Sequence, residues 1–133
     1  MDLEILKIAS NTENHKVIKN CTHSSKNKNP LCGDEMQISL IVEENKIIEF
    51  GYQCRSCIYC QASVSLLSQK VIKLSIDKIS KLISNAELLF DKSFDQSKID
   101  ELNDLKKIIN PKNISRKECL LLPFKTLSKA LNL

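Results

Sequence analysis

Two short segments in the first half of the chain alternate between apolar and polar side chains, which is the pattern of strands with one buried face. They cover residues 36–43 and 46–53, and the two polar residues between them suit a tight turn. This pattern predicts an antiparallel hairpin. We interpret Val17–Ile18 as a further short strand within the otherwise polar connection 11–30.

Apolar residues recur at helical spacing over most of the rest of the chain. The predicted helices cover residues 3–9, 62–74, 76–90 and 97–109, and a last one runs from Ser115 to Leu133. Ser97 and Ser115 are each followed three residues later by an acidic residue, as in a capping box. Asn110–Pro111 ends the fourth helix, and Pro123 restarts or kinks the last one. We therefore expect a single α+β domain over residues 1–133, with a small antiparallel sheet of about three strands packed against four to five helices.

Composition narrows the class of protein. The chain has 133 residues, of which 42% are hydrophobic and 27% charged, enough for one folded core. Two glycines exclude a Gly-rich phosphate loop. The net charge is only +4 and lysines are spread along the chain, so we expect no nucleic-acid partner. The start is acidic, and no apolar run is long enough for a signal peptide or a membrane span, so we expect a cytoplasmic protein with reduced thiols.

The six cysteines are the main candidates for chemistry, because clustered cysteines in a reducing compartment indicate a metal or catalytic site rather than disulfides. Cys54, Cys57 and Cys60 form a C-x2-C-x2-C run before a predicted helix, whose N-terminal dipole favours thiolate over thiol. Cys32 lies two residues before Asp34, so a thiolate and a carboxylate can point the same way from an extended segment. Cys119 lies near the start of the last predicted helix. We regard Cys21 as incidental.

The residues alone leave two other uses of Cys54, Cys57 and Cys60 open. The run resembles the start of a bacterial ferredoxin motif, although Val64 replaces its fourth cysteine. An iron–sulfur electron carrier is therefore one alternative, and a structural zinc-binding interaction module is another. Cys54 and Cys60 are equally compatible with being small core residues.

Three stretches in order along the chain resemble the IscU/NifU-like family of iron–sulfur cluster assembly scaffolds. Residues 29–34 read N-P-L-C-G-D, like the family's N-P-x-C-G-D segment. Residues 57–67 resemble its cysteine followed by an A-S-x-S helix start, and residues 116–127 are similar to its R-x-x-C-x-x-L-P-W-x-x-L ending. The resemblance extends over nearly the whole chain and is nearest to the SufU-like branch. Cys57 and Cys119 are 62 residues apart, and Glu118 stands where IscU-type members carry histidine.

This resemblance implies a metal site made of Cys32, Asp34, Cys57 and Cys119, with zinc as the expected metal and iron or an iron–sulfur cluster as alternatives. It implies a pyridoxal-phosphate cysteine desulfurase of the SufS type as partner, and downstream assembly or acceptor proteins. Cys32 would accept persulfide sulfur in the SufU manner, or Cys119 in the IscU manner, which makes the protein at most a zinc-dependent sulfurtransferase. Cys54 and Cys60 are additions to the family pattern and possible extra ligands.

Overall fold

The computed structural model describes residues 3–30, 33–91 and 103–133. Its strands form one three-stranded antiparallel sheet in the order β1-β2-β3, and four α-helices lie among the described residues. The strands are β1 (His23–Lys28), β2 (Glu35–Glu43) and β3 (Lys46–Arg55); the helices are α1 (Leu3–Ala9), α2 (Ile58–Val71), α3 (Ile76–Ala86) and α4 (Lys117–Ala130), with short 3-10 turns η1 (Glu87–Phe90), η4 (Leu105–Lys107) and η5 (Pro111–Arg116). The α+β class expected from the sequence is confirmed.

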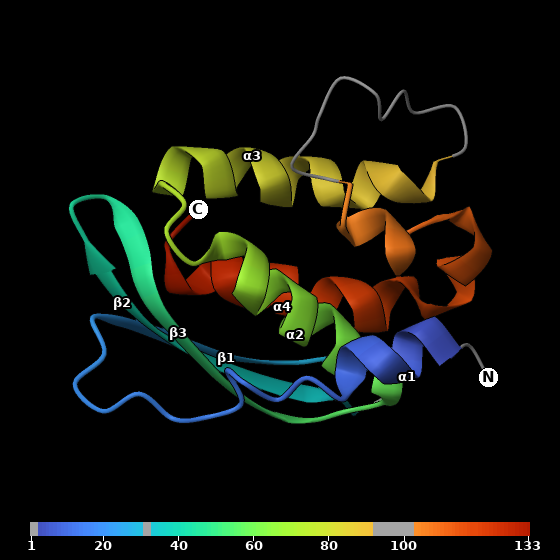
Figure 1. Cartoon of the computed structure of the whole chain (residues 1–133), viewed down its shortest axis with the longest axis horizontal. Helices are drawn as coiled ribbons and strands as arrows, with labels where there is room; N and C mark the ends of the chain where they lie inside the picture. The colour runs from blue at the N-terminus through green and yellow to red at the C-terminus, as the bar shows by residue number, and fades with distance from the viewer. Residues whose placement is uncertain (1–2, 31–32, 92–102) are drawn as a thin grey trace.

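The helices cover one face of the sheet (Figure 1). α2 and α4 lie side by side against it, α3 packs on α4 away from the sheet, and α1 packs beside α2. The core between sheet and helices is made of fully or almost fully buried apolar side chains, among them Ile38, Leu40, Phe50, Leu67, Phe124 and Leu127. No helix among the described residues is long and apolar enough to cross a bilayer.

The predicted hairpin is confirmed as β2 and β3, which pair from Glu35 opposite Arg55 to Glu43 opposite Lys46. Glu44 and Asn45 both have positive φ, at 51° and 64°. This is the backbone of a two-residue turn whose twist matches the strands it joins.

The third strand lies outside the predicted position. Val17–Ile18 is not a strand; instead the polar segment His23–Lys28 forms β1 and pairs with β2. The inward-facing residues of β1 are polar and meet α4: Ser25 Oγ donates to the Thr126 carbonyl at 2.6 Å. Because these polar side chains are satisfied by another element, the strand carries no apolar alternation that a sequence pattern could reveal.

The structure of the last third of the chain also differs in detail from the prediction. The predicted capping box at Ser97 lies outside the described residues, and what is described of the fourth predicted helix is a single turn, η4, rather than a long helix. The predicted capping by Ser115 is wrong, because α4 is preceded by Arg116 and has no side-chain cap. α4 runs through Pro123 as one helix, so the helix does not restart there.

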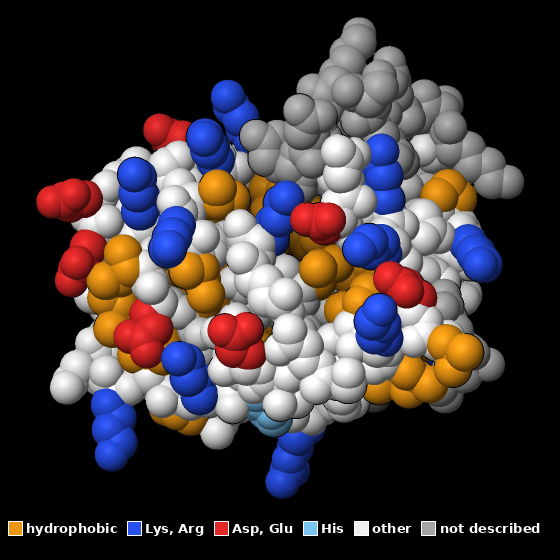
Figure 2. Space-filling view, in the orientation of Figure 1, with side chains coloured by type: hydrophobic (Ala, Val, Ile, Leu, Met, Phe, Trp, Pro, Cys, Tyr) orange, Lys and Arg blue, Asp and Glu red, His pale blue; other side chains and the backbone are white. Residues whose placement is uncertain are grey.

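On the face seen in Figure 2, lysine and arginine side chains alternate with aspartate and glutamate. The ion pairs are mostly exposed; an example is Lys125 with Glu118, at 3.1 Å. Such pairs contribute little to stability.

Candidate metal and thiol site

The first turns of two long helices meet beside the start of β2. Cys57 is the N-cap of α2, with extended backbone angles of −69° and 165°, and Cys119 is the third residue of α4. Asp34 immediately precedes β2. One potential ligand atom from each of these three residues lies within 4.8 Å of the other two. The structure therefore brings together three of the four predicted ligands, which are 23 and 62 residues apart in the sequence.

The loop before β2 sets the position of Asp34. Gly33 has φ +78°, a left-handed conformation that glycine adopts without strain. The Gly33 N–H donates to the Asn29 carbonyl and the Asn29 N–H to the Asp34 carbonyl, both at 2.8 Å. Two backbone hydrogen bonds thus join Asn29 to Gly33 and Asp34 and hold Asp34 inward, where it is only 6% exposed.

The Asp34 carboxylate is only partly satisfied. Its Oδ1 accepts a hydrogen bond from the Cys57 N–H at 3.3 Å, but its buried Oδ2 has no hydrogen-bond partner among the described residues. A buried carboxylate oxygen without a partner is costly, and a bound cation would remove that cost. Two cysteine sulfurs and one carboxylate oxygen are a ligand set that suits zinc or iron. The residues present therefore fit a metal ion.

Both helix N-termini favour negative charge at this point. α2 and α4 each have 14 residues, and their free N–H groups place positive potential around Cys57 and Cys119. A helix N-terminus is a favourable place for a bound negative charge, and thiolate is the form of cysteine that binds metals and attacks sulfur.

Two further contacts hold the two helices together beside the site. The Arg116 guanidinium lies 5.0 Å from the centre of the Tyr59 ring, which joins the residue before α4 to the first turn of α2. Ser63 of α2 donates from Oγ to the Leu120 carbonyl of α4 at 2.6 Å, and both residues are buried. Both serve to fix the distance between Cys57 and Cys119. Tyr59 and Ser63 both lie in the motif 57–67, but that motif alone does not indicate that they support the site.

Cys54 and Cys60, the two possible extra ligands, do not belong to the group of three. Cys60 is fully buried in the core, and burial raises the pKa of its thiol far above its ordinary value. Cys54 is half-buried near the end of β3, and burial raises the pKa of its thiol as well. The negative charge of Asp34 acts in the same direction on both thiols, so they lie near the site without forming part of the described ligand group.

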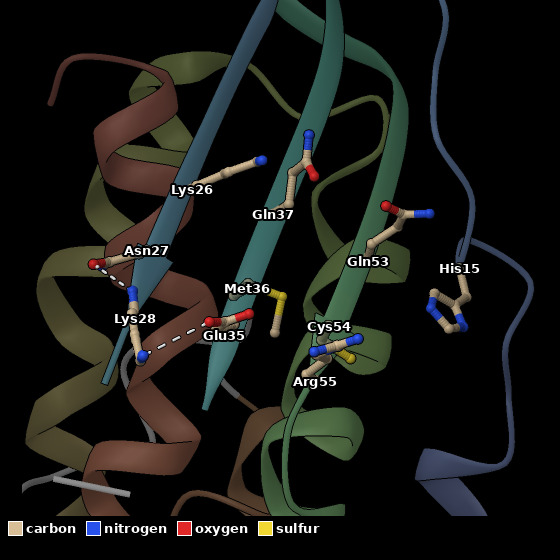
Figure 3. Close-up of a pocket in the computed structure, with 10 residues that line it drawn as sticks. All are labelled: His15, Lys26, Asn27, Lys28, Glu35, Met36, Gln37, Gln53, Cys54 and Arg55. Carbon is tan, nitrogen blue, oxygen red and sulfur yellow. Dashed lines mark hydrogen bonds and ion pairs between the residues drawn. The ribbon is translucent and has the colours of Figure 1, made fainter. Parts of the chain in front are cut away.

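A cavity of about 600 Å³ lies beside the site, on the exposed face of the sheet (Figure 3). Lys26 of β1, Gln37 of β2 and Gln53 of β3 project from its floor, and Lys28 pairs with Glu35 at 3.8 Å. Cys54 is its one cysteine among the described residues. The cavity therefore approaches the site through Cys54 and does not include the three clustered ligands.

Cys32 lies outside the described residues, so its predicted place beside Asp34 stays a prediction. Cys21 is half-buried in the segment before β1 and does not belong to the group of ligands. His15 stacks on Tyr52 with ring centres 5.1 Å apart, which gives it a packing role.

The sequence of the chain is similar to those of known proteins. Residues 2–102 match the family described as NifU-like N terminal domain. The chain is 30% identical over 128 residues to the iron–sulfur cluster assembly scaffold protein IscU of Thermotoga maritima, covering 96% of this chain and 89% of that protein.

Two solved structures of similar proteins have the same fold as this chain. A Fervidobacterium islandicum AW-1 protein assigned as an iron–sulfur cluster assembly scaffold for the SUF system is 27% identical, with a TM-score of 0.83 over 98% of this chain and 96% of that one. The N-terminal NifU-like protein of Brucella abortus, at 17% identity, has a TM-score of 0.81 over 98% of this chain and 91% of its own, and supports the fold.

Proposed function

The chain belongs to the IscU/NifU-like family of iron–sulfur cluster assembly scaffolds, on its SufU-like branch, and from that premise we propose that it accepts persulfide sulfur from a cysteine desulfurase. The sulfur is received at a metal site of Cys32, Asp34, Cys57 and Cys119, and is then relayed or built into a cluster. The observation that carries this proposal is the convergence of Asp34, Cys57 and Cys119 on one point.

The proposed metal is zinc, with iron or an iron–sulfur cluster as the alternative. Cys57, Cys119 and Asp34 would hold it, and Cys32 would complete a tetrahedral set. When bound, the metal keeps its thiol ligands deprotonated at neutral pH. Asp34 is the one oxygen ligand, and the Cys57 N–H already occupies one of its oxygens. A carboxylate is a weaker partner for a soft metal than thiolate, so this position suits a site that must open.

The proposed transfer is a thiol exchange. A scaffold thiolate attacks the outer sulfur of the desulfurase persulfide, the S–S bond of the donor breaks, and the desulfurase cysteine leaves as a thiolate. The outer sulfur remains on the scaffold as a new persulfide, without change in total electron count. Cys32 is the proposed acceptor in the SufU manner and Cys119 the alternative. Because no substrate is permanently converted on the scaffold itself, the protein is at most a sulfurtransferase.

The proposed partner is a pyridoxal-phosphate desulfurase of the SufS type, followed by downstream assembly or acceptor proteins. We propose that all 133 residues act as one scaffold domain in the cytoplasm. The other use of the C-x2-C-x2-C run, as ligands of a stable electron-carrying cluster, has less support. Cys54 and Cys60 are not among the clustered ligand atoms of the described residues, and Cys60 is fully buried.

The test is incubation of the full-length protein with a SufS-type desulfurase and cysteine, followed by mass spectrometry under non-reducing conditions. We expect one added sulfur atom, mapped to Cys32 or Cys119. Cys32→Ser and Cys119→Ser should separate the two acceptors, with Cys21→Ser as the matched control that still accepts sulfur. The proposal would be contradicted if the wild-type protein showed neither added sulfur nor release of sulfide above the level of the desulfurase alone.

A further inference from the structure

Two cysteines at the start of α2 form a C-x-x-C pair that the metal site does not use as a pair. Cys57 is the N-cap, and Cys60 is the third residue of the helix. The Gln61 N–H donates to the Cys57 carbonyl at 3.1 Å, so the helix begins directly after Cys57. Cys57 is half-buried and Cys60 fully buried, and both carry free thiols.

The Cys57 thiol is among the charges that act on the Cys60 thiol, so the two cysteines belong to one neighbourhood. Cys57 is the N-cap and Cys60 the third helical residue, so the two cysteines lie within one turn of each other at the start of α2. A cysteine at a helix N-terminus followed three residues later by a second cysteine is also the arrangement of reactive dithiol motifs, in which the first thiol is nucleophilic. Cys57 and Cys60 can therefore approach closely enough for a disulfide with little change in the backbone.

The Asp34 carboxylate of the metal site also lies close to this helix start. Its Oδ1 is held by the Cys57 N–H, and its Oδ2 is buried without a hydrogen-bond partner among the described residues. The carboxylate charge acts on the Cys60 thiol as well as on the nearby Cys54 thiol. Both cysteines thus lie near this carboxylate at the start of α2, which is at the end of the molecule where α1 packs on that helix (Figure 1).

We propose that Cys60 is a resolving thiol, which reacts with a persulfide on Cys57 to give a Cys57–Cys60 disulfide and to release the outer sulfur as sulfide. The proposal rests on the proposed function, since the persulfide sulfur must first reach the site. Ligand atoms of Cys57 and Cys119 lie within 4.8 Å, so the sulfur passes from Cys119 to Cys57 by thiol exchange if Cys119 receives it.

The step balances without an outside reagent. The Cys60 sulfur attacks Sγ of Cys57, and the bond between that Sγ and the outer sulfur breaks. The bonding electron pair leaves with the outer sulfur, which takes the Cys60 proton and departs as hydrogen sulfide ion. The outer sulfur gains two electrons, and the two cysteine sulfurs together lose two as they form the disulfide. An external dithiol reductant is needed only afterwards, to return the pair to its reduced state.

The consequence is a further activity, the reduction of sulfane sulfur to sulfide within the scaffold. Persulfide sulfur is not yet at the oxidation level of the sulfide in an iron–sulfur cluster. Cys57 and Cys60 together would supply the two missing electrons, and Cys60 is protected from solvent. This gives a role to a cysteine that the described metal-ligand group does not include.

The test uses the full-length protein as purified, reduced and then separated from small thiols. It is incubated with desulfurase and cysteine, and released sulfide, protein persulfide and disulfides are measured on the same samples. In the wild type we expect released sulfide and a Cys57–Cys60 disulfide in equal amounts. In Cys60→Ala we expect the persulfide to persist and sulfide release to fall to the level of desulfurase alone. Cys54→Ser is the matched control, because Cys54 is also three residues from Cys57, and it should behave as the wild type.

The outcomes separate the two proposals. If no variant gains a persulfide and the wild type forms neither sulfide nor disulfide, the proposed function fails. If the wild-type persulfide persists as in Cys60→Ala, or the disulfide joins Cys57 to Cys54 or Cys119, sulfur acceptance stands and the resolving role is wrong. Should Cys60→Ala fold poorly in a denaturant titration, the mapped disulfide and sulfide yield of the wild type decide the question alone.

Discussion

The backbone N–H of Cys57 donates to Asp34 Oδ1 at 3.3 Å, and this bond joins the start of α2 to the loop before β2. It fixes the carboxylate against a cysteine that is 23 positions away in the sequence. It also leaves the second carboxylate oxygen buried and without a hydrogen-bond partner among the described residues. Asp34 is therefore held in place by the fold, and its second carboxylate oxygen is available to a metal ion.

Asp34→Asn should weaken metal binding while leaving the fold intact. Asparagine keeps an oxygen that can accept from the Cys57 N–H, but it lacks the negative charge that a cation needs. We expect a loss in zinc affinity of about tenfold or more, measured by competition with a chromogenic chelator. Glu35→Gln, which changes the exposed neighbouring acid in the ion pair with Lys28, is the control. Equal zinc affinity in Asp34→Asn and the wild type would remove Asp34 from the ligand set.

Cys54→Ser and Cys60→Ala should retain the metal content of the wild type. Neither residue belongs to the described ligand group, and Cys60 packs in the core. Cys57→Ser and Cys119→Ser, in contrast, should lose most of the bound metal. Elemental analysis of the anaerobically purified proteins, together with their absorption spectra, measures this. Loss of metal from the first two variants would favour a cluster held by the C-x2-C-x2-C run.

The Cys60 thiol should make stability depend on pH in the alkaline range. Burial raises its pKa above the ordinary value of 9.0, so the folded protein keeps a proton that the unfolded chain loses. The contribution of the Cys60 thiol to the free energy of unfolding is complete below about pH 9 and falls as the pH rises further. The stability of the metal-free wild type should therefore decline relative to Cys60→Ala by up to about 1.4 kcal/mol per pH unit above that point. Urea unfolding at pH 8 and pH 10 tests this, and parallel curves for the two proteins would contradict it.

Ser63→Ala should destabilise the contact between α2 and α4. It removes the donor to the buried Leu120 carbonyl, next to Cys119. We expect a loss of about 1–3 kcal/mol in the free energy of unfolding, because a buried acceptor loses its side-chain donor. Ser84→Ala is the matched control, since Ser84 makes a similar bond to the Ser80 carbonyl on the exposed surface of α3. If both variants cost the same, the Ser63 bond is no stronger than a surface one.

The hairpin and the first helix were predictable because each buries one face, and a buried face imposes its own period on the sequence. β2 and β3 alternate, and α1 agrees with the predicted range 3–9. β1 was not predictable in this way. Its inward residues are polar, and Ser25 finds its partner on α4, 101 positions later. A strand whose polar groups are satisfied by a distant helix has no local signature.

The tertiary structure also explains why position 51 is a glycine, since another segment passes close to its backbone. A side chain there would place its Cβ 2.6 Å from the Lys16 carbonyl oxygen and 3.0 Å from the Ile18 side chain. This requirement comes from the segment that crosses β3, not from the strand pattern around Gly51. The sequence showed a glycine near the cysteines, and only the packing of residues 16–18 gives it a reason.

By itself, the sequence determined which reactive groups are present, namely the cysteines and Asp34, in motifs that resemble those of a scaffold family. It also indicated that some of these cysteines stand at helix starts, where thiolate is favoured. It could not determine which cysteines meet, because spacing along a chain says little about distance in space. The packing of α2 against α4 brings Cys57 and Cys119 to Asp34, and the same helix turn directs Cys60 into the core. Three cysteines that look equivalent in C-x2-C-x2-C thereby acquire different surroundings, since one strand end and one helix turn expose their side chains to different amounts of solvent.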